Sequence, residues 1–285
     1  KRPLSHLLID LPTWLWKNRI KNKDPKKTMT YTYRLAGENL ELAKAEIQGF
    51  LKTQEIKESP ARNGRIAQTS THPAQLKRLA LTHEITKKTT EIKTDQLEEF
   101  KPKERPKGSF SINCKVLKGD KRAPKIEEIL GEKFSSENNS VDLEQPETEI
   151  YAYIQNEKIV IGKLIQKINR GLYKERSNEK RPFSSPVSLD PILARTLVNL
   201  SETPASGRIL DPFCGTGGIL IEAGLCGIQP LGTDTKKEMV KGTRKNLEEY
   251  GIISHEIRQL DAERSLEEFA EFDSIITDLP YGKAS

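Results

Sequence analysis

One stretch constrains the fold more than any other: residues 208–218, RILDPFCGTGG. Its apolar start ends on Asp211, which indicates a short buried strand, and the glycines after it indicate a tight turn. An apolar helix is expected directly after the turn. A strand, a glycine-rich turn and a helix in this order are typical of the carboxyl edge of a parallel sheet, where nucleotide-containing ligands bind.

The rest of the C-terminal third continues this alternation. Strands are expected over 208–211, 230–234, 256–261 and 272–278, and helices over 218–226 and 236–250. This order is that of half a doubly wound parallel sheet. A further helix is expected over 188–200, with Asp190 as its N-cap and with an apolar face made of Leu189, Ile192, Leu193, Leu197 and Leu200.

The glycine turn suits a cationic ligand better than a dinucleotide. It lacks the G-x-G-x-x-G spacing, and Asp211 would repel a pyrophosphate. S-adenosylmethionine fits better, because its amino group can lie near an acid while its carboxylate points at the amides that begin the helix. Glycine at positions 215 and 217 would let the backbone approach such a ligand closely.

Two further acids follow successive strands of the expected sheet. Asp234 ends the second strand, where a carboxylate can accept hydrogen bonds from ribose hydroxyls. Asp261 ends the third, where it can accept from an adenine amino group. Each acid alone would more often be a helix cap or a turn residue. Three acids at three successive strand ends, with Asp211 beside the glycine turn, favour one shared site.

The second motif is DLPYG, residues 278–282. The Asp278 carboxylate and the Leu279 carbonyl could both accept N–H bonds from an exocyclic amino group, which would direct its lone pair at a methyl donor. Pro280 would hold the carbonyl outward, and Tyr281 would offer a face on which a base can stack. A simple turn would explain the proline and glycine but not the acid and the aromatic.

The cysteines point to a reducing environment. Cys114, Cys214 and Cys226 are widely spaced, so neither a disulfide framework nor a metal site is expected. Cys214 has no accompanying histidine and is expected to be a small buried residue, which argues against a thiolate mechanism. No apolar run reaches the roughly 18 residues of a membrane span. A cytoplasmic monomer without metal or membrane contact is therefore expected.

The N-terminal part has the pattern of a small α+β unit. Strands are expected from Tyr31, over 64–70, over 109–117 and on both sides of a turn at 156–158. Helices are expected over 38–51, from His72 onward with Leu76, Leu79, Ala80 and Ile85, and over the stripe Ile126, Ile129, Leu130 and Phe134. Residues 1–28 do not fit this pattern and are expected to be a disordered leader.

Charge divides the chain. Residues 182–285 hold ten Lys/Arg and 16 Asp/Glu, a net −6, although the whole chain is +6. Residues 101–125 hold nine Lys/Arg and two acids, and 163–181 hold seven and two. Such runs can be merely solvated faces or can bind nucleic acid. A polyanionic substrate would have to be bound by the N-terminal part.

These motifs carry a family resemblance that covers about residues 29–285. DPFCGTGG with DLPYG resembles the amino-methyltransferases of the N2-guanine tRNA type, and RPFSSPVSLDPILARTLVNL resembles the segment that precedes their cofactor turn. YRLAGENLELAKAEIQGFL and VDLEQPETEIYAYIQNEKIVIGKLI resemble the ferredoxin-like and THUMP domains of archaeal tRNA (guanine-10 N2) methyltransferases.

The resemblance implies a multidomain α+β and α/β fold. Residues 29–165 would be a ferredoxin-like and THUMP region that binds RNA, 166–182 a basic linker, and 183–285 an S-adenosylmethionine-dependent methyltransferase domain. That domain would be Rossmann-like but incomplete, because the remaining strands of the usual seven would follow Ser285. Leu279 stands where the family more commonly has proline, which widens the possible acceptor class.

The resemblance also implies site residues. Asp211, Phe213, Gly215 and Gly217 would bind the methionine part of the cofactor, Asp234 its ribose and Asp261 its adenine; Phe183 and Pro186 would line the same pocket, and Asp278, Leu279, Pro280 and Tyr281 would bind the guanine.

The implied function is transfer of a methyl group from S-adenosylmethionine to N2 of a guanosine in tRNA, at position 10. One alternative is an adenine-N6 methyltransferase acting on DNA or ribosomal RNA, which would label adenosine. Another is a non-catalytic RNA-binding module, which would bind tRNA without affinity for the cofactor.

Overall fold

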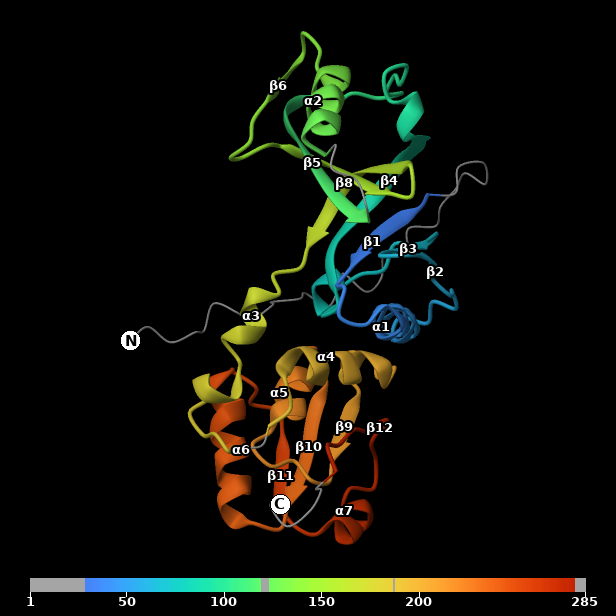
Figure 1. Cartoon of the computed structure of the whole chain (residues 1–285). Helices are drawn as coiled ribbons and strands as arrows, with labels where there is room; N and C mark the ends of the chain where they lie inside the picture. Colours follow the sequence, from blue (N-terminus) through green and yellow to red (C-terminus); the bar gives the residue numbers. More distant parts are fainter. Residues whose placement is uncertain (1–28, 119–122, 187, 280–285) are drawn as a thin grey trace.

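The computed structural model describes residues 29–118, 123–186 and 188–279. The leader expected over 1–28 lies outside the described residues, as do Pro280 and Tyr281. The chain forms an N-terminal half built on one large sheet and a C-terminal half built on a smaller parallel sheet (Figure 1). None of the helices in the described ranges is long and apolar enough to cross a membrane.

The N-terminal half is an eight-stranded sheet in the order β2-β3-β1-β4-β8-β7-β5-β6. Its strands are β1 (Tyr31–Leu35), β2 (Ala61–Asn63), β3 (Ile66–Thr69), β4 (Thr82–Lys93), β5 (Gly108–Lys118), β6 (Asn139–Val141), β7 (Thr148–Gln155) and β8 (Lys158–Lys167). Two helices pack on it, α1 (Leu40–Lys52) and α2 (Ala123–Phe134).

Two of the cores on this sheet are each covered by one helix. Buried Tyr33 and Phe50 belong to the core under α1, whereas Phe110 and Leu130 belong to the core under α2. The long strands β4 and β8 pair with each other between the two cores, and their register shifts twice along the pairing. The two α+β units of the N-terminal half are therefore joined through continuous backbone hydrogen bonding.

The helix expected from His72 onward is wrong. A single 3-10 turn, η3 (Leu76–Arg78), is followed at Thr82 by strand β4. The apolar residues that suggested a helix are buried beneath α1 instead. The β-branched residues of β4 pair with β1 on one side and β8 on the other, and this sheet pairing outweighs a spacing that also fits a helix.

The C-terminal half has a four-stranded parallel sheet in the order β11-β10-β9-β12, as half of a doubly wound sheet requires. Its elements are α4 (Pro191–Leu200), β9 (Arg208–Asp211), α5 (Gly218–Gly224), β10 (Gln229–Asp234), α6 (Lys237–Glu249), β11 (Glu256–Gln259), α7 (Ala262–Glu268) and β12 (Ser274–Ile275). Helix α7 was not expected, and β12 is far shorter than the strand expected over 272–278.

Helices cover both faces of the parallel sheet. Ile209 points into the core formed with α4 and α5, whereas its neighbour Leu210 packs against Phe269 at the end of α7. The connector from the N-terminal half contains α3 (Gly171–Lys174) and a 3-10 turn, η5 (Asn178–Lys180). Tyr173 of this connector is buried, so it is not an exposed stacking platform for RNA.

The buried face of α4 differs from the face expected from its leucines. Asp190 caps the helix as expected, because its Oδ1 accepts hydrogen bonds from the amides of Ile192 and Leu193. Leu193, however, is 38% exposed. Arg195 and Asn199 are buried instead. This helix lies between α1 and α5, where it presents polar side chains to a buried contact between the two halves (Figure 1).

Candidate active site

The glycine turn lies at the carboxyl end of β9, as expected. Gly215 has φ +52° and Gly217 has φ +80°, both in the left-handed region that favours glycine. A Cβ at position 217 would also lie 2.8 Å from Cγ2 of Thr243 in α6. The Thr243 hydroxyl donates to the Gly215 carbonyl at 2.6 Å and holds the turn against α6. The backbone path therefore requires glycine at 217 for two independent reasons.

Asp211 is a buried acid at the head of this turn. It is 3% exposed, and its Oδ1 accepts a hydrogen bond from the Phe213 amide at 3.1 Å. Burial raises the pKa of Asp211 to about 7, and the nearby carboxylates of Asp278 and Asp234 add to the increase. The described residues provide no Lys or Arg that pairs with it. This arrangement is suited to binding a cationic group.

Asp234 fastens the turn to the next strand. Its Oδ2 accepts from the Gly215 amide at 3.2 Å, and its Oδ1 accepts from the Lys236 amide at 2.8 Å. The side chain is half-buried, so part of the carboxylate remains open to a ligand. The structure therefore brings together Asp211, Asp234 and Asp278 from the ends of three strands.

Asp261 has a different environment. It is exposed and forms the N-cap of α7, where its Oδ1 accepts from the Arg264 amide at 2.8 Å. Its position after β11 agrees with the expected strand end. No contact links it to the glycine turn within the part of the chain that the structure describes. Its expected role with adenine remains a prediction.

The DLPYG motif, residues 278–282, begins three residues after β12, and we call it the acceptor motif after its expected role. Asp278 is half-buried, and Leu279 is 63% exposed. Phe213, which follows Asp211 and was expected to bind the cofactor, is 38% exposed at the same edge. Two exposed apolar side chains, Phe213 and Leu279, therefore lie at the edge of the sheet that carries the acids.

Phe183 lies over α6. Its backbone amide and carbonyl are both bound by Asn246, at 2.9 and 2.8 Å, and its ring lies against Gly242, where a Cβ would clash. Asn246 also donates to the Thr216 carbonyl at 2.9 Å. This buried asparagine therefore ties the Phe183 segment to the glycine turn. Pro186 is exposed and has no such tie among the described residues.

The roles of Asn246 and Arg181 were not predicted from the sequence. The sequence feature that could have identified Asn246 is that it is a polar residue on the apolar face of α6. Arg181, which lies in the expected basic linker, is buried and donates to Ser188 Oγ at 2.9 Å and to Thr216 Oγ1 at 3.5 Å. Both residues hold the segment before α4 against the turn.

Cys214 is buried within the turn, as expected. Burial raises the pKa of its thiol well above the ordinary value, which keeps it protonated and unsuited to nucleophilic attack. Across the described ranges, no cluster of three or more His, Cys, Asp or Glu side chains could hold a metal ion.

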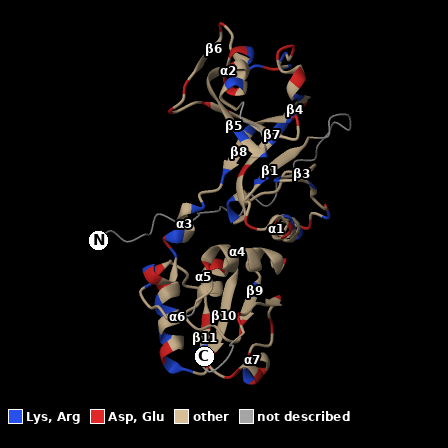
Figure 2. Ribbon diagram, in the orientation of Figure 1, with Lys and Arg blue, Asp and Glu red and all other residues tan. Residues whose placement is uncertain are grey.

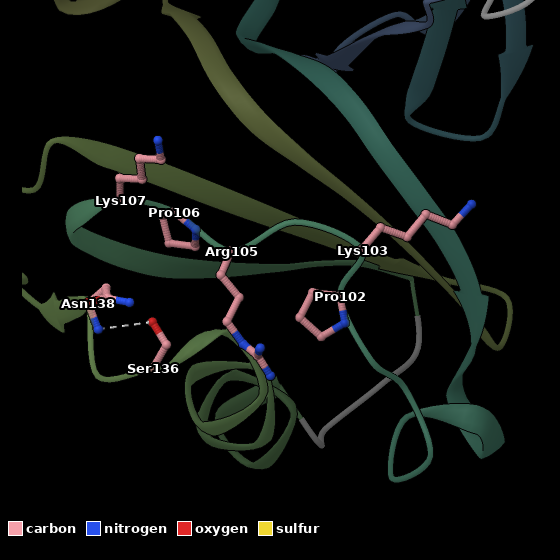
Figure 3. A pocket seen from close by; sticks show the side chains of 7 residues that line it. All are labelled: Pro102, Lys103, Arg105, Pro106, Lys107, Ser136 and Asn138. Carbon is pink, nitrogen blue, oxygen red and sulfur yellow. Dashed lines mark hydrogen bonds between the residues drawn. The ribbon is translucent and has the colours of Figure 1, made fainter.

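A second feature lies far from the glycine turn, in the N-terminal half. A hollow of about 560 Å³ is lined by Pro102, Lys103, Arg105, Pro106, Lys107, Ser136 and Asn138 (Figure 3). Three of these side chains are cationic, and we call this feature the basic hollow. It lies between the segment that leads into β5 and the loop after α2, in the half of the molecule opposite to the acidic site (Figures 1 and 2).

Known protein families match part of the N-terminal half and the whole C-terminal half. The family profile of the THUMP domain matches residues 82–162, and that of the RMKL-like methyltransferase domain matches 178–285. The tRNA (guanine(10)-N2)-dimethyltransferase of Methanothermobacter thermautotrophicus is 38% identical over 258 residues, which are 87% of this chain and 76% of that protein. The chain belongs to this family. The Pyrococcus abyssi relative of the same name is 40% identical over 186 residues, 64% of this chain and 56% of that protein.

The crystal structure of TrmN from Thermus thermophilus has the same fold, with a TM-score of 0.51 at 20% identity over 89% of this chain and 80% of that one. The expected fold class, with a THUMP domain and a Rossmann-like methyltransferase domain, is confirmed. The THUMP match begins with β4, the strand that joins the two cores of the large sheet.

Proposed function

We propose that this chain transfers methyl groups from S-adenosylmethionine to the exocyclic N2 of a guanosine in tRNA, at position 10. The observation that carries the proposal is the group of three acids around the glycine turn. Asp211 is buried without a cationic partner in the described part of the chain, and Asp278 of the acceptor motif is near enough to raise its pKa. Relatives named for this reaction support the same reading.

The residues present fit S-adenosylmethionine. Asp211 supplies a buried carboxylate for the ammonium group, and Gly215 faces open space, because a Cβ there would meet only the Phe213 carbonyl oxygen, at 4.0 Å. Asp234 offers a partly open carboxylate to the ribose, beside the amides of the turn. When bound, the cofactor supplies a methyl group on a cationic sulfur. Phe183, fixed by Asn246, would cover one side of the pocket.

The acceptor end works through hydrogen-bond acceptors. The Asp278 carboxylate and the Leu279 carbonyl would accept hydrogen bonds from the two N–H groups of the guanine amino group. This contact would hold the nitrogen lone pair toward the methyl group and stabilise the positive charge that develops on the nitrogen. Asp278 would then take up the proton released from the nitrogen.

RNA would be bound mainly by the N-terminal half. The C-terminal residues 182–285 carry a net −6 and would repel a polyanion. Lys103, Arg105 and Lys107 line the basic hollow and would contact phosphates. We further propose that the protein acts as a monomer in the cytoplasm. Size-exclusion chromatography with light scattering would test the oligomeric state.

The decisive experiment is transfer of methyl-tritiated cofactor to unmodified tRNA, followed by nucleoside analysis and position mapping. We expect label in N2-methylated guanosine at position 10. Label in adenosine would instead favour the N6-adenine alternative. Binding of tRNA with no measurable affinity for the cofactor would favour a non-catalytic RNA-binding module.

A further inference from the structure

The two halves of the molecule meet where α1 packs on α4. Gly49 of α1 lies so close that a Cβ there would be 2.5 Å from the backbone oxygen of Asn199 and 3.1 Å from Cα of Leu200. Only glycine permits this approach. We call this contact, together with the neighbouring buried side chains of Glu46, Arg78 and Asn199, the seam.

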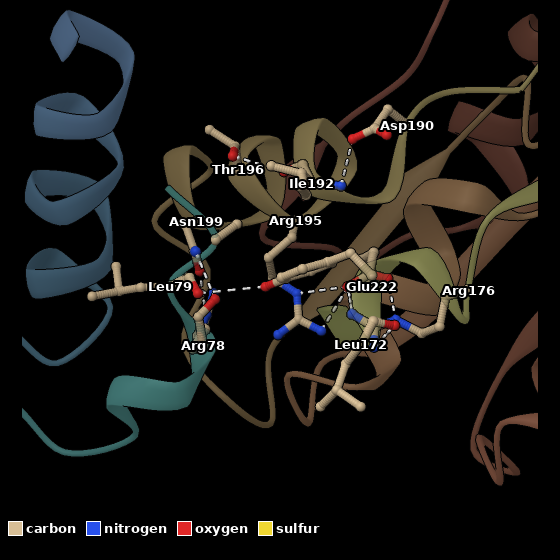
Figure 4. Close-up of polar contacts among 12 residues, drawn as sticks. Arg78, Leu79, Leu172, Arg176, Asp190, Ile192, Arg195, Thr196, Asn199 and Glu222 are labelled. Carbon is tan, nitrogen blue, oxygen red and sulfur yellow. Dashed lines mark hydrogen bonds and ion pairs between the residues drawn. The ribbon is translucent and has the colours of Figure 1, made fainter. Parts of the chain in front are cut away.

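Next to this contact lies a fully buried polar cluster (Figure 4). Glu46 of α1 accepts hydrogen bonds from the amides of Ala80 and Leu81, at 2.7 and 2.9 Å. Asn199 of α4 donates to Glu46 Oε1 at 2.8 Å and to the Arg78 carbonyl at 3.1 Å. Its own Oδ1 accepts from Arg78 Nε at 2.7 Å. The Asn199 amide is thus bound on both its donor and acceptor sides by the N-terminal half.

The seam is linked to the cofactor turn through one short helix. Glu222 of α5 is 1% exposed and binds Arg195 of α4 at 2.7 Å and Arg176 of the connector at 2.6 Å. Glu222 lies four residues after Gly218, about 6 Å along the helix axis. The same helix therefore begins at the glycine turn and is fixed to α4, which forms the seam.

Directional contacts of this kind favour one arrangement of the two halves. Contacts between domains of one chain usually allow relative motion. Buried hydrogen bonds resist sliding, because a shift of the helices would leave polar groups without partners in a low-dielectric interior. The basic hollow and Asp278 lie in different halves, so the seam fixes their separation.

We propose that the seam is a rigid joint that holds the RNA-binding half at one distance and angle from the methyl-transfer site, with Asn199 as a positioning residue that determines which guanosine reaches Asp278. This inference rests on the proposed function. It adds that selection of the nucleotide depends on contacts that touch neither RNA nor cofactor.

A direct test measures the rigidity itself. Spin labels on exposed Glu128 of α2 and Glu248 of α6 report the distance between the halves by pulsed electron resonance. The unaltered chain should give one narrow distance distribution, and Gly49→Ala or Asn199→Ala should broaden or shift it. Gly131→Ala is the matched control, because a Cβ at 131 meets nothing within 4 Å. A broad distribution in the unaltered chain, or no change in either seam variant, overturns the proposal.

The functional test compares two RNA substrates with the full chain. On tRNA, the seam variants should lose about 10- to 100-fold in kcat, with unchanged Kd for cofactor and for tRNA, and should label additional guanosines. On a short guanosine-containing stem–loop that cannot reach the basic hollow, their rate should equal that of the unaltered chain. An equal loss on both substrates would mean a merely structural role and would overturn the proposal.

Two further outcomes keep the proposal separate from the function itself. If the alanine variants do not fold, Asn199→Asp keeps the side-chain volume while replacing the donor to Glu46 with an acceptor, and the same results are expected of it. If the unaltered chain binds cofactor and tRNA but transfers no methyl group, the proposed function fails, and the distance measurement still decides the inference.

Discussion

Two buried carboxylates in the catalytic half have opposite surroundings. Glu222 is 1% exposed and lies between the guanidinium groups of Arg176 and Arg195. Asp211 is 3% exposed, yet no Lys or Arg pairs with it among the described residues, and its nearest charges are other acids. The charge of Glu222 is balanced within the folded chain, whereas that of Asp211 is left for a ligand. Burial alone therefore does not distinguish a structural acid from a binding acid; the partners do.

The largest effect is expected at Glu222, the carboxylate that is paired with arginines. Glu222→Gln removes the charge between two buried arginines and should lower the free energy of unfolding by about 3–5 kcal/mol. Glu128→Gln is the control, because its ion pair with Lys125 is exposed and should contribute less than about 1 kcal/mol. Chemical denaturation measures both. Equal, small losses would show that Glu222 is not the anchor that its contacts indicate.

The acceptor motif gives the next largest effect. Asp278→Ala should reduce methyl transfer by about 10²- to 10³-fold, because the group that orients and deprotonates the amino nitrogen is lost. Cofactor affinity, measured by calorimetry, should stay within a few fold, since Asp211 and the glycine turn remain. Retained turnover would remove Asp278 from the proposed mechanism.

Removing the charge of Asp211, the unpaired carboxylate, should stabilise the ligand-free protein. Asp211→Asn keeps the shape but removes a buried charge, so the free energy of unfolding at pH 8 should rise by about 1–3 kcal/mol while cofactor affinity falls. Asp190→Asn serves as the control, because asparagine caps a helix as well as aspartate does and should change stability little. Destabilisation by Asp211→Asn would contradict the comparison that separates Asp211 from Glu222.

The same carboxylate should make the protein sensitive to pH. The pKa of Asp211 rises from its ordinary 3.8 to about 7 on folding, so the folded state retains a proton that the unfolded state has lost. The free energy of unfolding without ligand should therefore fall as pH rises from about 4 to about 7. Cofactor affinity should change in the opposite direction and increase through pH 7, because only the ionised carboxylate attracts the ammonium group. Both trends should be weaker in Asp211→Asn.

The elements whose structure depends on residues close together in the sequence could be predicted from the sequence alone. The strand, glycine turn and helix around Asp211 follow from neighbouring residues, because the left-handed turn needs glycine and the strand needs a short apolar run. The same reasoning identified the N-cap at Asp190.

Tertiary contacts explain what the sequence did not reveal. Thr82 begins a strand because β1 and β8 flank it, although the spacing before it also suits a helix. Asn199 and Asn246 are buried polar residues whose partners lie 153 and 63 residues away, at Glu46 and Phe183. A pattern that assigns buried faces from apolar residues alone cannot find them. Both became interpretable only when their partners were known.

The same comparison of paired and unpaired charges can be made for the lysines of the N-terminal half. The smallest effect is expected from a substitution in the basic hollow. Lys103 and Lys107 line it without an ion pair among the described residues, whereas Lys158 is paired with Glu91 elsewhere on the same half. We expect these unpaired lysines to contact RNA phosphates. Lys103→Ala should weaken tRNA binding a few fold and reduce the slope of log Kd against log salt by about 1. Lys158→Ala is the control and should leave the slope unchanged. Equal slopes in all three proteins would show that the hollow does not contact phosphate.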